Sequence, residues 1–253
     1  VTPRRQRQMC IRDRASGFLK DKISNYVFSA LPLNVQNEQE IEAAITENTE
    51  LVASKLKDTP ESFQITVLYD LWKTASSSSL NNVADSIFSN SLKDLAIKNG
   101  EQVIVDDIEL SSRLRLGAIS PELTWKENDA LVHLSDLKET DHYILIFWSS
   151  TCSHCLKELP ALHKELKNYK NSTIIAVGLE DDQANWSLEI KKLPNFKHAL
   201  ALGKWQSDYA QVFGIKQTPT YFILNKDKRF INKPKDDKEV ISFLKESIQN
   251  AND

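Results

Sequence analysis

The spacing of apolar residues divides the chain into a helical part and a part that alternates between strands and helices. From Phe18 to about Gly100, apolar residues recur at helical intervals, most clearly within residues 41–56, 63–72 and 83–95. This part shows neither a strand pattern nor a cluster of titratable side chains. It therefore predicts a helical packing or partner-docking region rather than a second active site.

Short signals mark where these helices begin and end. Thr59 and Pro60 predict an N-cap followed by the first helical residue. The serine run from Ser76 to Ser79 predicts a break. Gly100 stands where a helix C-terminus is expected.

From about Gly117 the pattern changes to alternating strands and helices. Tyr143 to Trp148 is a short, wholly apolar run, as expected for a strand buried on both faces, and Thr173 to Gly178 (TIIAVG) is predicted to be a second buried strand. The other predicted elements are helices over Ser153–Tyr169, Asp182–Leu193, Trp205–Phe213 and Asp237–Gln249, and strands over Thr220–Leu224 and Arg229–Asn232. This order predicts an α/β domain with a mixed sheet, closed by a hairpin and a helix.

The bulk composition excludes several classes of protein. The 253 residues suffice for two small domains. The formal net charge of −3 offers no basic surface for nucleic acid or for an acidic membrane. No apolar run approaches the roughly 20 residues that a membrane-spanning helix needs, and three cysteines are too few for a disulfide scaffold.

The first fourteen residues differ in composition from the rest of the chain. They contain five arginines, a single acidic residue (Asp13) and the only methionine, Met9. Met9 to Asp13 can be back-translated into a sequence that resembles the transposase end used in sequencing libraries. We interpret residues 1–14 as a translated adapter, not as a basic arm or targeting peptide, and leave them out of fold arguments. Cys10 then carries no function, and a natural signal peptide or lipid anchor would be missing from the sequence.

Cys152 and Cys155 lie where a buried strand gives way to a helix. Unpaired backbone N–H groups and the helix dipole at such a point favour a thiolate, which is the species that attacks disulfides. We expect Cys152 to be the more exposed, attacking cysteine, and Cys155, one turn further on, to be the buried, resolving one. His154 adds a donor or a positive charge beside the Cys152 sulfur.

Other uses of a CxxC pair fit the sequence less well. The pair could ligate zinc together with the nearby His154 and His163. A structural zinc site normally has four ligands, however, often from two CxxC motifs, and the sequence contains no second CxxC. A structural disulfide across two residues would remove little chain entropy. A peroxiredoxin-type peroxidase would need a proline shortly before Cys152, where none occurs. Surface or packing roles, rather than metal binding, are expected for His133, His142, His163 and His198. Positions in the core, rather than roles as binding platforms, are expected for Trp148, Trp186 and Trp205, with Trp148 beside the site.

Three motifs in order make residues 115–250 resemble the TlpA/ResA-like family. They are GAISPELTW at 117–125, FWSSTCSHCLKELP at 147–160 and GIKQTPTYFIL at 214–224. The resemblance implies a thioredoxin fold, in which helices flank a mixed central sheet, preceded here by an α-helical region. The domains expected are therefore a helical region over 15–110 and a thioredoxin-like domain over 115–253.

The resemblance also implies roles for individual residues. Pro219 matches the family proline that faces the CxxC pair and is cis in family members, and Glu158 matches the glutamate that follows the pair. We expect Glu158 to accept or donate a proton near Cys155. We expect Thr218 and Pro219 to shape the substrate groove, with the Thr218 backbone free to pair with an extended substrate segment. The residues expected to support the site are Trp148, Ser153, His154, Thr218 and Pro219.

Some positions depart from the pattern of thioredoxins. Ile146 stands where cytosolic thioredoxins carry a buried aspartate, so Glu158 is a candidate to replace that proton acceptor. Thr151 replaces a tryptophan that commonly precedes the first cysteine. Ser153 and His154 replace the usual Gly-Pro between the cysteines, and a histidine before the second cysteine predicts a potential less reducing than that of thioredoxin.

The predicted function is thiol-disulfide exchange with partner proteins, in the reducing direction typical of TlpA/ResA-like proteins. No organic cofactor and no metal are expected, because electrons pass between Cys152, Cys155, substrate thiols and an upstream thiol donor. The resemblance implies a periplasmic protein, membrane-tethered through the missing N-terminus, with no nucleic-acid partner. The alternative is a redox-inert or metallochaperone-like binding module, and a thiol peroxidase is a further one.

Overall fold

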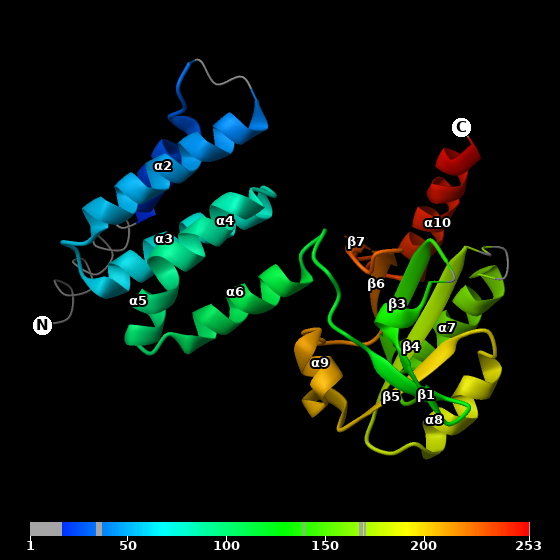
Figure 1. Cartoon of the computed structure of the whole chain (residues 1–253). Helices are drawn as coiled ribbons and strands as arrows, with labels where there is room; N and C mark the ends of the chain where they lie inside the picture. The colour runs from blue at the N-terminus through cyan, green and yellow to red at the C-terminus, as the bar shows by residue number, and fades with distance from the viewer. Residues whose placement is uncertain (1–16, 34–36, 139, 167–168, 170, 253) are drawn as a thin grey trace, which may run out of the picture. The chain divides into compact units, whose positions relative to one another are not determined.

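A computed structural model describes residues 17–33, 37–138, 140–166, 169 and 171–252 (Figure 1). It divides into two compact units, Val1–Ile108 and Glu109–Asp253. Residues 1–14, which we interpret as an adapter, lie outside the described residues. Each unit has a hydrophobic core of its own.

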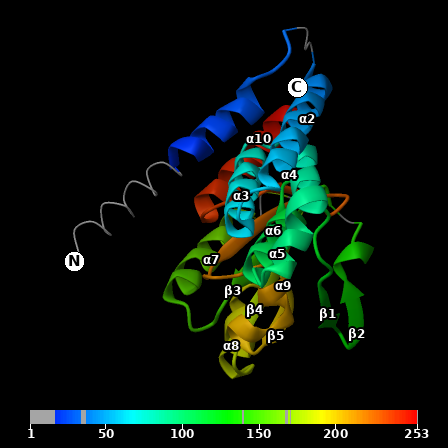
Figure 2. The same cartoon turned by 90° about the vertical axis from the view of Figure 1, so that its left-hand side faces the viewer.

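The first unit is helical, as the apolar spacing predicts. Its elements are a helix over 17–29, α2 (Glu38–Leu56), α3 (Glu61–Ser77), α4 (Asn81–Ile87), a π-helical turn (Phe88–Leu92), α5 (Lys93–Lys98) and the first part of α6 (Gln102–Leu114). The α2, α3 and α4 helices run side by side (Figure 2). Their facing side chains, with Leu71 and Trp72 among them, form a buried core.

The helix boundaries in this unit follow the sequence signals with one correction. Pro60, not Thr59, is the N-cap of α3, because its carbonyl accepts the Phe63 and Gln64 N–H groups. Thr59 instead donates its hydroxyl to the Leu56 carbonyl at the end of α2. Gly100 has a φ of 77° and follows α5, as a C-terminal stop requires.

A π turn explains an irregular step in the apolar pattern. Ile87 and Leu92 are five residues apart, a spacing that an ideal α-helix would turn toward different faces. The π turn over Phe88–Leu92 winds less per residue. Both side chains are consequently buried, with Ile87 1% and Leu92 0% exposed.

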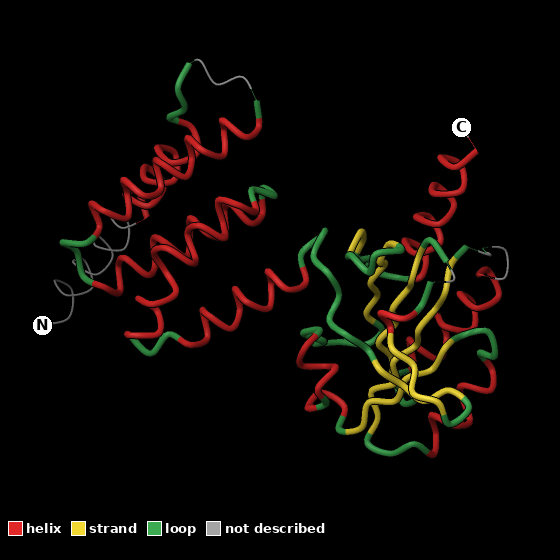
Figure 3. The backbone as a smooth tube through the Cα atoms, viewed as in Figure 1, coloured by secondary structure: helices red, strands yellow, loops and turns green. Residues whose placement is uncertain are grey.

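The second unit contains a five-stranded mixed sheet in the order β5-β4-β3-β6-β7 (Figure 3). Its strands are β3 (His142–Trp148), β4 (Ser172–Glu180), β5 (Lys197–Leu202), β6 (Thr220–Asn225) and β7 (Phe230–Asn232). The first three run parallel to one another, and β6 and β7 are antiparallel to their neighbours. A separate hairpin pairs β1 (Thr124–Glu127) with β2 (Ala130–His133).

Helices cover both faces of this sheet. The helices are α7 (Ser153–Leu166), α8 (Ala184–Glu189), α9 (Asp208–Val212) and α10 (Asp237–Asn252), with 3-10 turns at Leu134–Asp136, Ile190–Lys192 and Lys204–Gln206. Side chains of α7 and α10 pack on one face, against Ile144, Ile146 and Trp148. Side chains of α9, of the β1–β2 hairpin and of the end of α6 pack on the other, against Tyr143, Leu145 and Phe147.

The expected thioredoxin-type α/β fold is therefore present, although several elements differ from prediction. The strand β5, the β1–β2 hairpin and α6 were not among the predicted elements. The predicted helix over Trp205–Phe213 is a 3-10 turn followed by α9, because Ser207 caps α9 by accepting the Ala210 N–H. The helix α8 is shorter than predicted and passes into a 3-10 turn before Leu193.

Candidate active site

Cys152 and Cys155 form a disulfide at the start of α7. Cys152 follows the buried strand β3 by four residues and is the helix N-cap, since its carbonyl accepts the Leu156 N–H at 3.0 Å. The Cys155 N–H points to the Cys152 sulfur at 3.2 Å. In the reduced protein these first-turn N–H groups would face a thiolate, which they stabilise.

The two sulfurs differ in access to solvent. Cys152 is half-buried, whereas Cys155 is 0% exposed and packs in the core beneath α7. Trp148, at the end of β3, is 1% exposed and belongs to the same cluster. Ser153 and His154, between the cysteines, are exposed. An incoming disulfide therefore meets Cys152 first.

The loop that leads into β6 approaches the reactive sulfur. The carbonyl oxygen of Thr218 lies 3.4 Å from Cys152 Sγ. The peptide bond between Thr218 and Pro219 is cis. The structure thus brings the TP and CxxC motifs, 66 residues apart in sequence, into direct contact.

Glu158 has a partner that the sequence did not reveal. Its carboxylate accepts a hydrogen bond of 2.9 Å from the hydroxyl of Tyr221 on β6. Tyr221 is 1% exposed and pairs with Ile146 in the sheet. Ile146 is the residue that stands where thioredoxins carry the buried acid. Burial and the neighbouring Glu158 charge both raise the pKa of Tyr221, so its hydroxyl stays protonated and donates. Side chains alternate between the two faces of β6, and Tyr221 lies on the face that α7 covers. This alternation is the sequence signal from which its proximity to α7 could have been predicted.

A second buried carboxylate anchors the loop before Cys152. Glu180, at the end of β4, is 2% exposed. It accepts hydrogen bonds from the backbone N–H and the hydroxyl of Ser150, and from the hydroxyl of Ser149. The Ser149 hydroxyl in turn lies 3.0 Å from that of Thr151. These bonds fix the backbone that presents the Cys152 sulfur, and the sequence analysis did not single out Glu180.

A small hollow opens beside the Cys152 sulfur. It encloses about 220 Å³ and is lined in part by Cys152, Thr218, Leu179 and Trp205. Trp205 is 40% exposed, so the prediction that it lies in the core is wrong. The reason is its place in the 3-10 turn over Lys204–Gln206, which projects from the end of β5 instead of packing as a helix face.

The remaining histidines pack or lie at the surface, as expected. His163 is buried with its ring edge on Phe196, and His142 meets Phe243 in the same way. His198 lies 3.0 Å from the Leu193 carbonyl through its Nε2. In the part of the chain that the structure describes, no three His, Cys, Asp or Glu side chains converge as a metal would require.

Comparison with known sequences shows that part of the second unit is similar to thioredoxin-like proteins. A family model described as thioredoxin-like matches residues 140–230. A protein named thiol-disulfide oxidoreductase ResA from Bacillus thuringiensis is 27% identical over 103 residues, which is 40% of this chain and 57% of that protein. The ResA of Bacillus anthracis matches to the same extent. The chain thus spans a little over half the length of these curated relatives.

Solved structures extend the likeness in fold. A thioredoxin-like protein from Bacteroides caccae, 16% identical, superposes with a TM-score of 0.52 over 89% of this chain and 91% of its own. At that identity the likeness concerns the fold alone. The chain thus carries a thioredoxin-like domain, matched over residues 140–230, which is similar in sequence to the ResA proteins.

Proposed function

We propose that the chain is a thiol-disulfide oxidoreductase that exchanges disulfides with partner proteins through Cys152 and Cys155. One observation carries the proposal: the accessible Cys152 sulfur at the start of α7 is bonded to a fully buried Cys155. A pair that served only as a cross-link would not need one partly exposed cysteine beside the Thr218 carbonyl.

The reaction is a two-electron exchange. In the reduced protein the Cys152 thiolate attacks one sulfur of a substrate disulfide, so a mixed disulfide forms and a substrate thiolate leaves. Cys155 then attacks the Cys152 sulfur, and the second substrate thiolate leaves. The substrate gains two electrons and two protons, and Cys152 and Cys155 return to the disulfide. An upstream dithiol donor reverses this step on the protein and completes the cycle without an organic cofactor.

Glu158 is placed to serve the second step. Cys155 must lose a proton before it attacks, and it lies in a core with little water. Glu158 is one helical turn beyond it and half-buried, which suits a proton acceptor. Tyr221 is a positioning residue, since it touches Glu158 and holds the carboxylate.

The substrate side of the site is the Thr218–Pro219 edge. Thr218 is half-buried and its carbonyl lies near the Cys152 sulfur. An extended segment of the substrate can pair with this backbone as an added strand while its cystine reaches Cys152. Partner proteins of this kind, rather than nucleic acid, suit a site made of thiols and open backbone.

A reducing role in an oxidising compartment such as the periplasm completes the proposal. Disulfides persist in such compartments, and the relatives that share the domain are named ResA. None of the helices among the described residues has the length and apolar character to cross a membrane. The membrane tether and the division into domains over 15–110 and 115–253 stay predictions.

Trapping of the mixed disulfide tests the proposed function. Reduced Cys155→Ser protein, mixed with oxidised insulin, should accumulate a covalent adduct at Cys152, because the attacking sulfur remains and the resolving one is gone. Cys152→Ser protein should form none, and wild type should reduce insulin catalytically in dithiothreitol. Adducts that form on Cys152→Ser but not on Cys155→Ser would reverse the two roles, and a wild type without activity would refute the function.

A further inference from the structure

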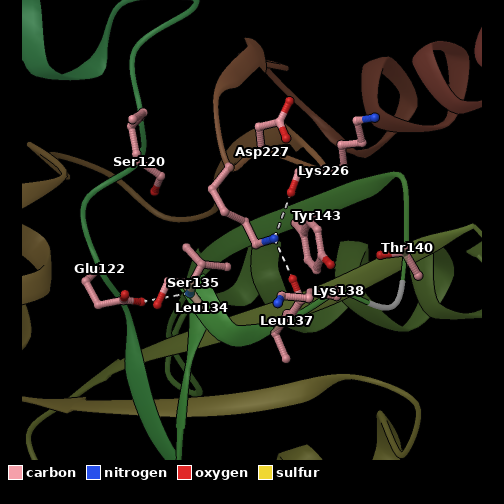
Figure 4. Close-up of a pocket in the computed structure, with 12 residues that line it drawn as sticks. Ser120, Glu122, Leu134, Ser135, Leu137, Lys138, Thr140, Tyr143, Lys226 and Asp227 are labelled. Carbon is pink, nitrogen blue, oxygen red and sulfur yellow. Dashed lines mark hydrogen bonds between the residues drawn. The ribbon is translucent and has the colours of Figure 1, made fainter.

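A larger cavity lies at the opposite end of β3 from the cysteine pair. It encloses about 550 Å³ and is lined in part by Tyr143, the second residue of β3. Cys152, by contrast, lies beyond the last residue of β3. Besides Tyr143, its walls come from three segments: residues 119, 120 and 122, residues 134, 135, 137, 138 and 140, and the hairpin loop 226–228. Figure 4 shows the Tyr143 ring between Lys226 and Asp227 on one side and Leu137 and Lys138 on the other. The thiol chemistry uses none of these residues.

The wall of this cavity contains a buried ammonium group. Lys228 is 8% exposed. Its Nζ donates to the Leu137 carbonyl at 2.7 Å and to the Lys226 carbonyl at 3.0 Å, and it lies 3.9 Å from the centre of the Tyr143 ring. Among the described residues no carboxylate forms an ion pair with it. Buried charges are normally paired with an opposite charge, so among the described residues this ammonium lacks its usual counterpart.

The backbone of Lys228 is also unusual for its residue type. Its φ is 60°, in the left-handed region where glycine is preferred. The three-residue loop 226–228 requires this conformation, since the Lys228 N–H returns to the Asn225 carbonyl. A long, buried cation at a glycine-type position points to a use for the side chain.

A second polar group in the wall has no hydrogen-bond partner among the residues that the structure describes. This group is the hydroxyl of Tyr143, which is buried, and Tyr143 as a whole is 0% exposed. A phenol can donate one hydrogen bond and accept others. It lines the same cavity as Lys228, so one ligand could meet both groups.

We infer that this cavity binds a small organic carboxylate, whose anionic group takes the Tyr143 hydroxyl as donor and Lys228 as counter-charge. The exposed ammonium groups of Lys138 and Lys226 also line it and add to the positive potential. Leu134 and Leu137 are buried and Ile119 is exposed, and these three give the cavity apolar walls that suit a hydrocarbon body.

Two carboxylates also line the cavity, and neither neutralises Lys228. Glu122 is exposed and its Oε1 accepts the backbone N–H groups of Leu123 and Ser135, which satisfies it locally. Asp227 is exposed in the hairpin loop and forms no ion pair with Lys228. The buried end of the cavity is thus cationic, while its acidic groups lie exposed. This arrangement selects one carboxylate with an apolar tail rather than a polyanion.

Benzoate is a suitable probe because it joins a carboxylate to an apolar ring. In a titration of the full chain followed by amide NMR, benzoate at millimolar concentration should shift the signals of residues 135–138 and 226–228. Benzamide, the uncharged isostere, should not. Lys228→Met should weaken benzoate binding about tenfold or more, as expected for a lost charge-assisted hydrogen bond. Tyr143→Phe, which keeps the ring, should weaken it by about threefold.

Matched controls make the result decisive. Lys216→Met removes an exposed lysine from the loop before Thr218, outside the cavity, and should leave benzoate binding unchanged. Should Lys228→Met fail to fold, Tyr143→Phe decides the question alone. The inference is overturned if benzoate causes no shifts near Lys228, if benzamide binds equally well, or if Tyr143→Phe binds benzoate as wild type does. Insulin reduction is measured separately and bears only on the proposed function.

Discussion

The Tyr221 hydroxyl and the Glu158 carboxylate lie 2.9 Å apart and join β6 to α7 one turn beyond Cys155. Glu158 is half-buried, and Tyr221, its partner, pairs in the sheet with Ile146, which stands where thioredoxins carry a buried acid. Because burial and the Glu158 charge raise the pKa of Tyr221, the tyrosine remains a donor at physiological pH. The proton-transfer role proposed for Glu158 requires that the carboxylate keep this position.

Replacement of Glu158 by Gln should change the pH dependence of disulfide exchange. Gln can still accept the Tyr221 hydrogen bond, so the fold should persist, but it cannot take a proton from Cys155. We expect the rate of resolution of the mixed disulfide to fall by about tenfold or more, within the usual range for a general base. Stopped-flow rates across the pH range would show this.

Tyr221→Phe separates positioning from proton transfer. It should shift the same pH profile less than Glu158→Gln does, and should cost about 1 kcal/mol of stability for the lost hydrogen bond. Glu165→Gln changes an exposed glutamate on the same helix and serves as the control. A profile for Glu158→Gln that overlays that of Glu165→Gln would remove Glu158 from the mechanism.

Replacement of His154 by Pro should make the protein a stronger reductant. His154 is exposed in the first turn of α7, where backbone N–H groups have no helical partner, so proline is tolerated. Loss of the imidazole should raise the pKa of the Cys152 thiol and lower the potential by about 30 mV, which corresponds to about 1.4 kcal/mol. Glutathione-buffer titration and thiolate absorbance measure the two quantities.

His154→Gln distinguishes the side chain from the backbone at this site. Glutamine keeps the N–H group but carries no charge, so it should reproduce most of the proline effect if the imidazole is responsible. Wild-type potential in both variants would mean that the helix N-terminus alone stabilises the thiolate.

Trp205→Ala should weaken the binding of protein substrates. The indole is 40% exposed and lines the hollow beside Cys152, so a substrate side chain next to the reactive cystine can pack on it. Aromatic contacts of this kind contribute about 0.5–1.5 kcal/mol, which predicts a KM about three- to tenfold higher with little change in kcat. Leu188→Ala, an exposed apolar residue on α8 outside the hollow, is the control. Equal effects of the two substitutions would contradict the assignment.

Stability should fall as the pH drops below about 6.5, the ordinary pKa of histidine. Burial lowers the pKa of both His198 and His142. The hydrogen bond between His198 and the Leu193 carbonyl opposes this effect but does not cancel it. The unfolded chain then binds more protons than the folded one, so the stabilisation is complete above about pH 6.5 and is lost as the pH falls toward the folded-state pKa.

Urea unfolding at several pH values tests this expectation. In His198→Gln the loss of unfolding free energy between about pH 7 and pH 5 should be smaller than in wild type. Identical slopes for wild type and His198→Gln would show that His198 does not contribute.

The sequence predicts the strands that are buried on both faces and misses those with mixed surroundings. β3 and β4 were predicted because each has an apolar central run, YILIFW in β3 and IIAVG in β4. β5 reads KHALAL, with two polar residues and two alanines, and its pairing with β4 decides its structure. The β1–β2 hairpin turns at Asn128 and Asp129, both with positive φ, a signal that the apolar pattern does not contain.

The site was predictable in its motifs but not in its partners. CxxC and Thr218-Pro219 are local signatures whose contact follows from the fold. Tyr221 reaches Glu158 across 63 residues, and Glu180 reaches Ser150 across 30, so only the sheet register brings these pairs together. Trp205 was misjudged because an aromatic residue in a turn carries no periodic signal.

The burial of Cys155 has a consequence for how the cysteine pair withstands oxidation by peroxide. Peroxide converts accessible thiolates first to sulfenic and then irreversibly to sulfinic acid. Of the two cysteines that the structure describes, Cys152 is the one that the reduced protein would offer to that attack, and a sulfenic acid there lies one helical turn from the sheltered Cys155 thiol. Condensation of the two regenerates the disulfide and releases water, so the buried partner repairs the exposed one before irreversible damage.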